Sequence, residues 1–231
     1  MDLSSFVIHL IELVAALSGS YYWLKTKDES VKLFVWYLWI TVFVETIGMY
    51  GYILQNNYDN ELFIRIKNSV FCSNKWLYNI YSFVSILLFG KFYSQVINDH
   101  LSKKIIKYSI YSYVLFVIFY FGLSGDFFIA SLPQDVFIET LLVFIFVMLY
   151  YKELLKSDDI LFFYKLPIFY LSSGLLLWYL VVTPLFIFDG YLTLVNLDFY
   201  DFRDKYLLIS IILLYSCYTF GFLYTLQFKK Q

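Results

Sequence analysis

Charged side chains are scarce in this sequence of 231 residues. Asp, Glu, Lys and Arg make up 15% of it, against about 25% in an average soluble domain. The formal net charge is -1, so we expect no basic surface and no nucleic acid partner. The two histidines and two cysteines form no cluster with the spacing of a zinc site or a disulfide framework. We therefore expect no enzymatic activity, no bound metal and no cofactor.

Apolar and aromatic side chains are abundant instead. Hydrophobic residues reach 61%, and aromatic residues reach 24%. A soluble domain of this length lacks the interior to bury so much apolar surface. The composition predicts an integral membrane protein. The first apolar run lacks a preceding basic segment and carries Glu12, so we interpret it as a retained span and not as a cleaved signal peptide.

Seven stretches of roughly 20 mostly apolar residues are long enough to cross a bilayer as helices. They are continuous and lack the alternation of barrel strands. The predicted fold is an all-α, seven-transmembrane helix bundle in which residues 1–231 form a single domain. The stretches are Ser5–Leu24, Leu33–Leu54, Trp76–Val96, Ile105–Leu123, Gln134–Tyr151, Leu166–Phe188 and Lys205–Phe228.

Basic residues predict the orientation of these spans. If the N-terminus lies outside, 12 of the 17 Lys and Arg residues fall on the inner side. Because inner segments carry the excess of basic residues, the N-terminus is predicted outside and the C-terminus inside. The inner residues are Lys25, Lys27, Lys32, Lys91, Lys103, Lys104, Lys107, Lys152, Lys156, Lys165, Lys229 and Lys230.

The loop pattern suggests an internal repeat. Spans one to three show a short inner loop and then a long outer loop, and spans five to seven do the same. Span three opens with Asn74-Lys75-Trp76-Leu77 and span seven with Asp204-Lys205-Tyr206-Leu207. A 3+1+3 plan, with the fourth span as an inverting connector, fits both receptors and small transporters.

Three carboxylates fall within the predicted spans, and all three lie in the outer half. An ionisable residue at membrane depth is costly and indicates a functional site. Other polar or aromatic residues share this half. We therefore predict an outward-facing acidic pocket that binds a small cation or amine. Its candidate residues are Glu12, Glu45, Asn79, Glu139, His9, Tyr78, Tyr81 and Thr183.

Other interpretations of these carboxylates stay open. A protonated Glu can hydrogen-bond a neighbouring helix and act only in packing. Glu12 could pair with His9 one turn away, and Glu139 could reach Lys75 or Lys205 near the outer surface. A proton relay is a further alternative.

Four stretches together carry a resemblance to known proteins. They are Glu12-Leu13-Val14-Ala15-Ala16, Trp36-Tyr37-Leu38-Trp39 leading to Glu45, Tyr78-Asn79-Ile80-Tyr81, and the run from Gly174 to Pro184. These stretches resemble small seven-helix membrane proteins that are common in Bacteroidetes. The resemblance covers nearly the whole chain and implies a bacterial inner-membrane location, but no activity.

The predicted function is a receptor-like or signal-relay protein that senses a small ligand. A separate membrane or cytoplasmic partner protein would read the change. The alternatives are a small-solute or ion transporter of 3+1+3 design, and a scaffold subunit of a membrane complex. Transport predicts a path past Gly90 and Gly221 to the inner face, whereas sensing or scaffolding predicts an inner half packed with aromatic side chains.

Overall fold

The computed structural model describes residues 3–55, 61–129, 133–192 and 197–229, and all regular structure in these ranges is helical. The elements, in chain order, are α1 (Leu3–Thr26), α2 (Lys32–Gly48), α3 (Tyr50–Gln55), α4 (Glu61–Lys67), α5 (Lys75–Val96), α6 (His100–Ser124), η1 (Asp126–Phe128), α7 (Pro133–Leu154), η2 (Asp158–Lys165), α8 (Pro167–Leu192) and α9 (Leu197–Lys229).

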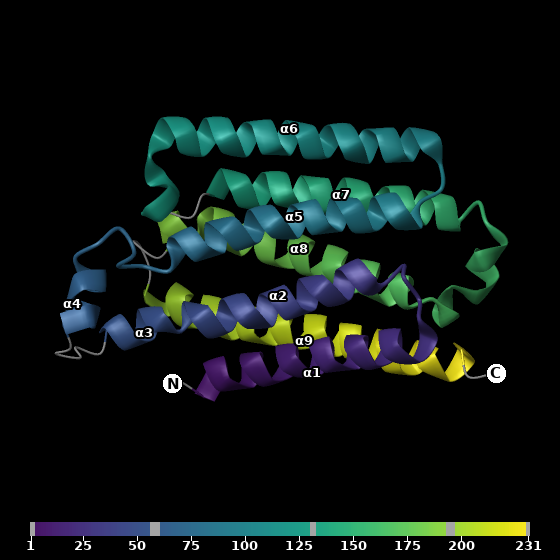
Figure 1. Ribbon diagram of the computed structural model, residues 1–231, viewed down its shortest axis with the longest axis horizontal. Helices are drawn as coiled ribbons and strands as arrows, with labels where there is room; N and C mark the ends of the chain where they lie inside the picture. Colours follow the sequence, from purple (N-terminus) through teal and green to yellow (C-terminus); the bar gives the residue numbers. More distant parts are fainter. Residues whose placement is uncertain (1–2, 56–60, 130–132, 193–196, 230–231) are drawn as a thin grey trace.

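The long helices lie side by side and alternate in direction (Figure 1). Helix α5 contacts α2, α6 and α7, and α1 packs along α9 although the two are far apart in sequence. Helix α6 lies at the edge of the bundle (Figure 1). The two termini lie at opposite ends, which we call the N-terminal end and the C-terminal end (Figure 1).

Each of the seven predicted apolar stretches is helical in the structure. Among the described residues, four helices are long and apolar enough to cross a membrane. This supports a membrane protein. The four segments are Ser4–Thr26, His100–Ser124, Pro167–Phe188 and Phe202–Lys229.

The second predicted stretch differs from the structure, because it does not form one continuous helix. Helix α2 ends at Gly48 after 17 residues, and α3 begins at Tyr50. Two glycines close together weaken a helix. Gly48 also allows a close approach, since a Cβ atom there would lie 2.8 Å from the Tyr78 hydroxyl.

Aromatic side chains fill the half of the bundle nearer the C-terminal end. The ring centroid of Phe34 lies 5.0 Å from that of Tyr218 and 5.4 Å from that of Phe92. These edge-on and tilted contacts are the geometries that aromatic pairs favour. The layer joins α1, α2, α5, α7 and α9, and its fully buried members are Tyr22, Phe34, Phe89, Phe92, Tyr93, Phe146, Tyr218 and Phe222.

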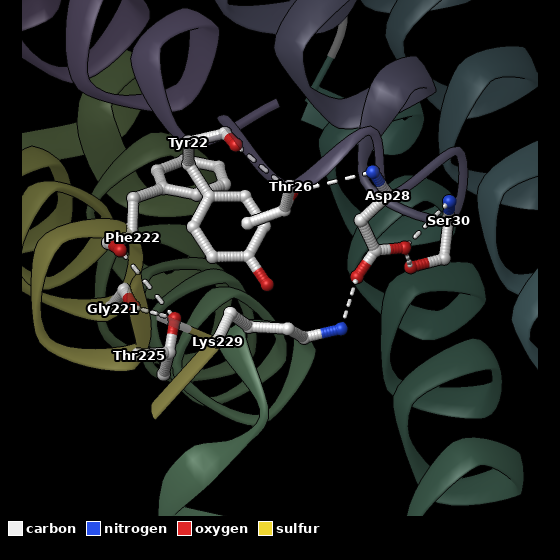
Figure 2. A network of polar contacts seen from close by, with 8 residues as sticks. All are labelled: Tyr22, Thr26, Asp28, Ser30, Gly221, Phe222, Thr225 and Lys229. Carbon is white, nitrogen blue, oxygen red and sulfur yellow. Dashed lines mark hydrogen bonds and ion pairs between the residues drawn. The ribbon is translucent and has the colours of Figure 1, made fainter. Parts of the chain in front are cut away.

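A polar contact joins the α1–α2 turn to α9 at the C-terminal end (Figure 2). Lys229 Nζ donates to Asp28 Oδ2 at 3.2 Å, and the backbone N–H of Ser30 donates to Asp28 Oδ1 at 3.1 Å. Burial acts to raise the pKa of Asp28, but the hydrogen bonds from Ser30 and the charge of Lys229 outweigh it and hold that pKa below its usual value.

The same end carries the basic residues that were predicted to lie inside. They occupy the α1–α2 turn, the α5–α6 junction, the α7–α8 connection and the end of α9, which the alternating helices bring together (Figure 1). Lys230 lies outside the described residues.

Candidate functional site

A cavity of about 170 Å³ lies between α1, α2, α5, α7, α8 and α9. Glu12, Glu45 and Glu139 all line it, although they come from three different helices. Tyr22, the member of the aromatic layer on α1, follows Glu12 by ten residues, so the cavity lies on the N-terminal side of that layer. A cavity of roughly 150 Å³ can hold a molecule the size of benzene. The space therefore suits a ligand of a few non-hydrogen atoms.

Glu139 connects helices. Its side chain is 6% exposed, and its Oε1 accepts hydrogen bonds from the Tyr113 hydroxyl at 3.0 Å and from the Ser82 hydroxyl. The donors belong to α6 and α5 respectively. These contacts support a packing role for Glu139.

Glu45 is also held by a tyrosine. Its Oε2 accepts a hydrogen bond of 2.9 Å from the Tyr78 hydroxyl, which connects α2 to α5. One turn before Glu45, the Thr41 hydroxyl lies 2.8 Å from the hydroxyl of Tyr81. The α2–α5 wall of the cavity is therefore fixed by side-chain hydrogen bonds.

The wall formed by α7 and α8 is fixed in a similar way. The hydroxyls of Thr140 and Thr183 are hydrogen-bonded to each other, and Thr183 donates to the backbone carbonyl of Tyr179. Thr183 thus lines the cavity with its hydroxyl already engaged.

Three polar atoms on the cavity wall have no hydrogen-bond partner in the described part of the chain. They are Glu12 Oε2, Ser85 Oγ and Trp178 Nε1. Glu12 is 4% exposed and Ser85 is 3% exposed. A buried polar atom that lacks a partner costs about 1–3 kcal/mol. The carboxylate offers an acceptor, the indole offers a donor and the hydroxyl offers either, so a ligand with both kinds of group would satisfy them.

Five of the eight predicted residues line the cavity, namely Glu12, Glu45, Tyr81, Glu139 and Thr183. Tyr78 contacts the cavity through Glu45. The lining set does not include His9 or Asn79. His9 Nδ1 lies 3.1 Å from the carbonyl oxygen of Ser5, and Asn79 Nδ2 donates to the carbonyl oxygen of Phe127 at 2.8 Å.

Two residues with unpartnered atoms were absent from the prediction. Ser85 follows Tyr81 by four residues, so the two share a face of α5, and this spacing was a usable signal. Trp178 gave no such signal, because it lies in the apolar and aromatic run between Ser173 and Thr183, where no polar stripe encodes the rotation of α8 in the bundle.

The fold and the cavity define a helical protein whose apolar segments support membrane insertion. No protein-family model, no curated protein and no solved structure matches the chain. The resemblance to the Bacteroidetes proteins stays a prediction.

Proposed function

We propose that this chain crosses a bacterial inner membrane seven times, with its N-terminus outside, and senses a small cation or amine in the cavity beside Glu12. The observation that carries the proposal is the convergence of three carboxylates and three unpartnered polar atoms on one small space. The proposal assigns no reaction to the chain.

The cavity indicates the chemistry of the ligand. Several carboxylates around a space of about 170 Å³ favour a positive charge, since like charges in a low-dielectric site need a counter-charge or a proton. The rings of Tyr37, Tyr81 and Tyr215 line the same space, and aromatic faces attract cations. Trp178 Nε1 requires an acceptor on the ligand. A short amine that also carries an oxygen satisfies these requirements.

The closed inner half favours sensing over transport. At Gly90 the position of a Cβ atom lies 2.3 Å from Ile110 Cδ1, and at Gly221 it lies 2.7 Å from Tyr170 Cβ. Neighbouring side chains therefore pack against both glycines, and the open space that Gly90 borders is a groove between α5 and α6, at the edge of the bundle. Below the cavity the aromatic layer is continuous, with Phe34, Phe89 and Tyr218 all at most 1% exposed.

A sensor of this kind needs a partner protein that reads its state. The described residues form one bundle of packed helices without a separate output module. We propose that a second membrane or cytoplasmic protein contacts the C-terminal end, where Asp28 of the α1–α2 turn pairs with Lys229 of α9 (Figure 2).

The test is thermal unfolding of the purified protein in detergent with ethanolamine as the probe. A ligand present at 100 times its Kd stabilises the folded state by about 2.7 kcal/mol. For a chain of this length this corresponds to roughly 5–10 °C in unfolding temperature. We expect this rise with ethanolamine, a smaller rise with tetramethylammonium, which offers no oxygen to Trp178, and none with the neutral analogue ethylene glycol.

Two variants locate the effect. Glu12→Gln keeps the shape of the side chain and removes its charge, so the ethanolamine shift should disappear. Glu61→Gln changes an exposed carboxylate on α4 and should leave the shift intact. A shift that survives Glu12→Gln, or the absence of any shift with ethanolamine, sodium or potassium, contradicts the proposed site.

A further inference from the structure

A second groove lies between α5 and α6 near the C-terminal end of the bundle. Its volume is about 540 Å³, and five basic residues line it. Lys91 comes from the last part of α5, and the others come from the first two turns of α6. No Asp or Glu is among the residues that line the groove. The five are Lys91, His100, Lys103, Lys104 and Lys107.

The positive charge of this groove is not neutralised by the described part of the chain. None of its four lysines has a carboxylate within ion-pair distance there. The acid nearest in sequence, Asp99, accepts hydrogen bonds from the backbone N–H and the hydroxyl of Ser102 and lies 3.6 Å from Lys152. The groove therefore presents to an anion four ammonium groups that no carboxylate of the described residues pairs with, and that of Lys107 lies 5.7 Å from the centroid of the Tyr111 ring.

An apolar stripe leads away from the basic groove along α6. Tyr111 lines the groove, and Leu115 and Ile118 follow it at spacings that keep them on the same face. They are 54%, 57% and 63% exposed respectively. Only 17% of the apolar stretch of α6 is buried inside the bundle, and the helix lies at its edge (Figure 1). A charged site continuous with an exposed apolar stripe suits a molecule with an anionic head and an apolar chain.

We propose that this groove binds an anionic phospholipid, with its phosphate among Lys91, Lys103, Lys104 and Lys107 and its acyl chain along Tyr111, Leu115 and Ile118. Basic pockets between membrane helices on the inner side are typical sites for such headgroups. The inference rests on the proposed membrane orientation, and it does not depend on a ligand in the cavity beside Glu12.

The test is native mass spectrometry of the detergent-purified protein titrated with phosphatidylglycerol. The test variant replaces Lys103, Lys104 and Lys107 by Gln. Each basic residue near an anionic headgroup strengthens lipid binding. We therefore expect the Kd of the first bound lipid to be about ten- to a hundredfold higher for this variant. Phosphatidylcholine, which has the same chains and no net charge, should not occupy the site.

A matched control distinguishes lipid binding in this groove from general attraction of anionic lipid to the basic C-terminal end of the bundle. It replaces Lys25, Lys27 and Lys156 by Gln, which removes the same charge from the same end of the bundle. The Kd for phosphatidylglycerol should stay within about twofold of that of the unaltered protein, because these lysines do not line the groove. The combined substitutions Lys103→Arg, Lys104→Arg and Lys107→Arg keep the charge and should retain binding. Equal losses in the test and control variants, or no loss in either, overturn the proposal.

Inorganic phosphate distinguishes the two sources of the anion. If the groove selects a lipid, millimolar phosphate does not displace phosphatidylglycerol, because the ion gains nothing from the apolar stripe on α6. Displacement by phosphate would show a site for a free anion and would overturn the assignment to a phospholipid. Binding at the cavity is measured separately by the ethanolamine shift, so either proposal can fail alone.

Discussion

Gly221 is the position where one added methyl group tests the helix packing most directly. A Cβ atom there would lie 2.7 Å from Tyr170 Cβ and 3.3 Å from its Cγ. The Cβ atom of Tyr170 is one bond from the backbone, so it can move only if α8 moves. We therefore expect Gly221→Ala to force α8 and α9 apart.

Gly90 differs from Gly221, because a Cβ atom at Gly90 would lie even closer to its nearest neighbouring atom. A Cβ atom at Gly90 would lie 2.3 Å from Ile110 Cδ1 and 2.7 Å from its Cγ1. These atoms belong to the flexible end of a side chain that borders the open groove between α5 and α6. Ile110 can change rotamer into that space, so Gly90→Ala should cost less than Gly221→Ala.

The magnitudes follow from overpacking and helix propensity. Overpacking a core costs about 1–3 kcal/mol, and replacing Gly by Ala within a helix gains about 0.5–1 kcal/mol. We expect Gly221→Ala to lose about 2 kcal/mol, which is roughly 4–8 °C in unfolding temperature. For Gly90→Ala the two effects nearly cancel. The control Gly122→Ala has no heavy atom within 4 Å of the added group and should gain up to about 1 kcal/mol.

The assay is thermal unfolding in detergent, followed by the fluorescence of the five tryptophans. The expected order of unfolding temperature is Gly122→Ala highest, then Gly90→Ala, then Gly221→Ala. The reasoning is refuted if Gly90→Ala is the least stable of the three, because the shortest distance would then decide the cost irrespective of which atoms can move.

Three further predictions concern polar and backbone features. Asp28→Asn should cost about 1 kcal/mol at neutral pH, because it removes the charge that Lys229 pairs with. Since the pKa of Asp28 is held below its ordinary value of about 3.9, its contribution is present above pH 4 and disappears as the pH falls, so variant and parent should converge in acid melts. Lys27 has a φ of 53°, a left-handed conformation that glycine adopts at less cost than lysine. Lys27→Gly should therefore stabilise the protein by about 1 kcal/mol, and the unfolding temperature in the same fluorescence assay should rise. Tyr113→Phe removes a donor from the buried Glu139 and should cost about 1–2 kcal/mol, whereas the exposed Tyr108→Phe should change nothing.

The sequence was sufficient to predict which residues lie at the same depth. Glu12, Glu45 and Glu139 fall at similar heights on their helices because the rise per residue is fixed, and the structure brings them to one cavity. The break at Met49 was not predicted, because the stretch is apolar on both sides of Gly48, which ends α2, and Gly51, which lies in α3.

The hydrogen-bond partner of each buried side chain could not be predicted in the same way. Asn79 was expected in the pocket, yet its side chain donates to the backbone carbonyl of Phe127 in η1, and Asn79 does not line the cavity. Where the polar residues of a helix form no single stripe, the sequence contains little information on rotation about the helix axis, since nothing marks the side that faces a given neighbour. The same reason explains why Trp178 was missed and why the acceptor role of Glu139 toward Tyr113 was not foreseen.

The proposed sensing role places a specific demand on α1. Glu12 lies in the cavity, and the turn that carries Asp28 lies at the other end of the same helix, about 20 Å away at the standard helical rise. A ligand shifts an equilibrium only if it binds one conformation better than another. Between the two points Tyr22 packs against Phe222 of α9 with ring centroids 5.7 Å apart, and Lys229 holds Asp28 beyond them (Figure 2). We therefore expect a movement of α1 that a ligand on Glu12 favours to alter these contacts at the C-terminal end, where the proposed partner protein would read it.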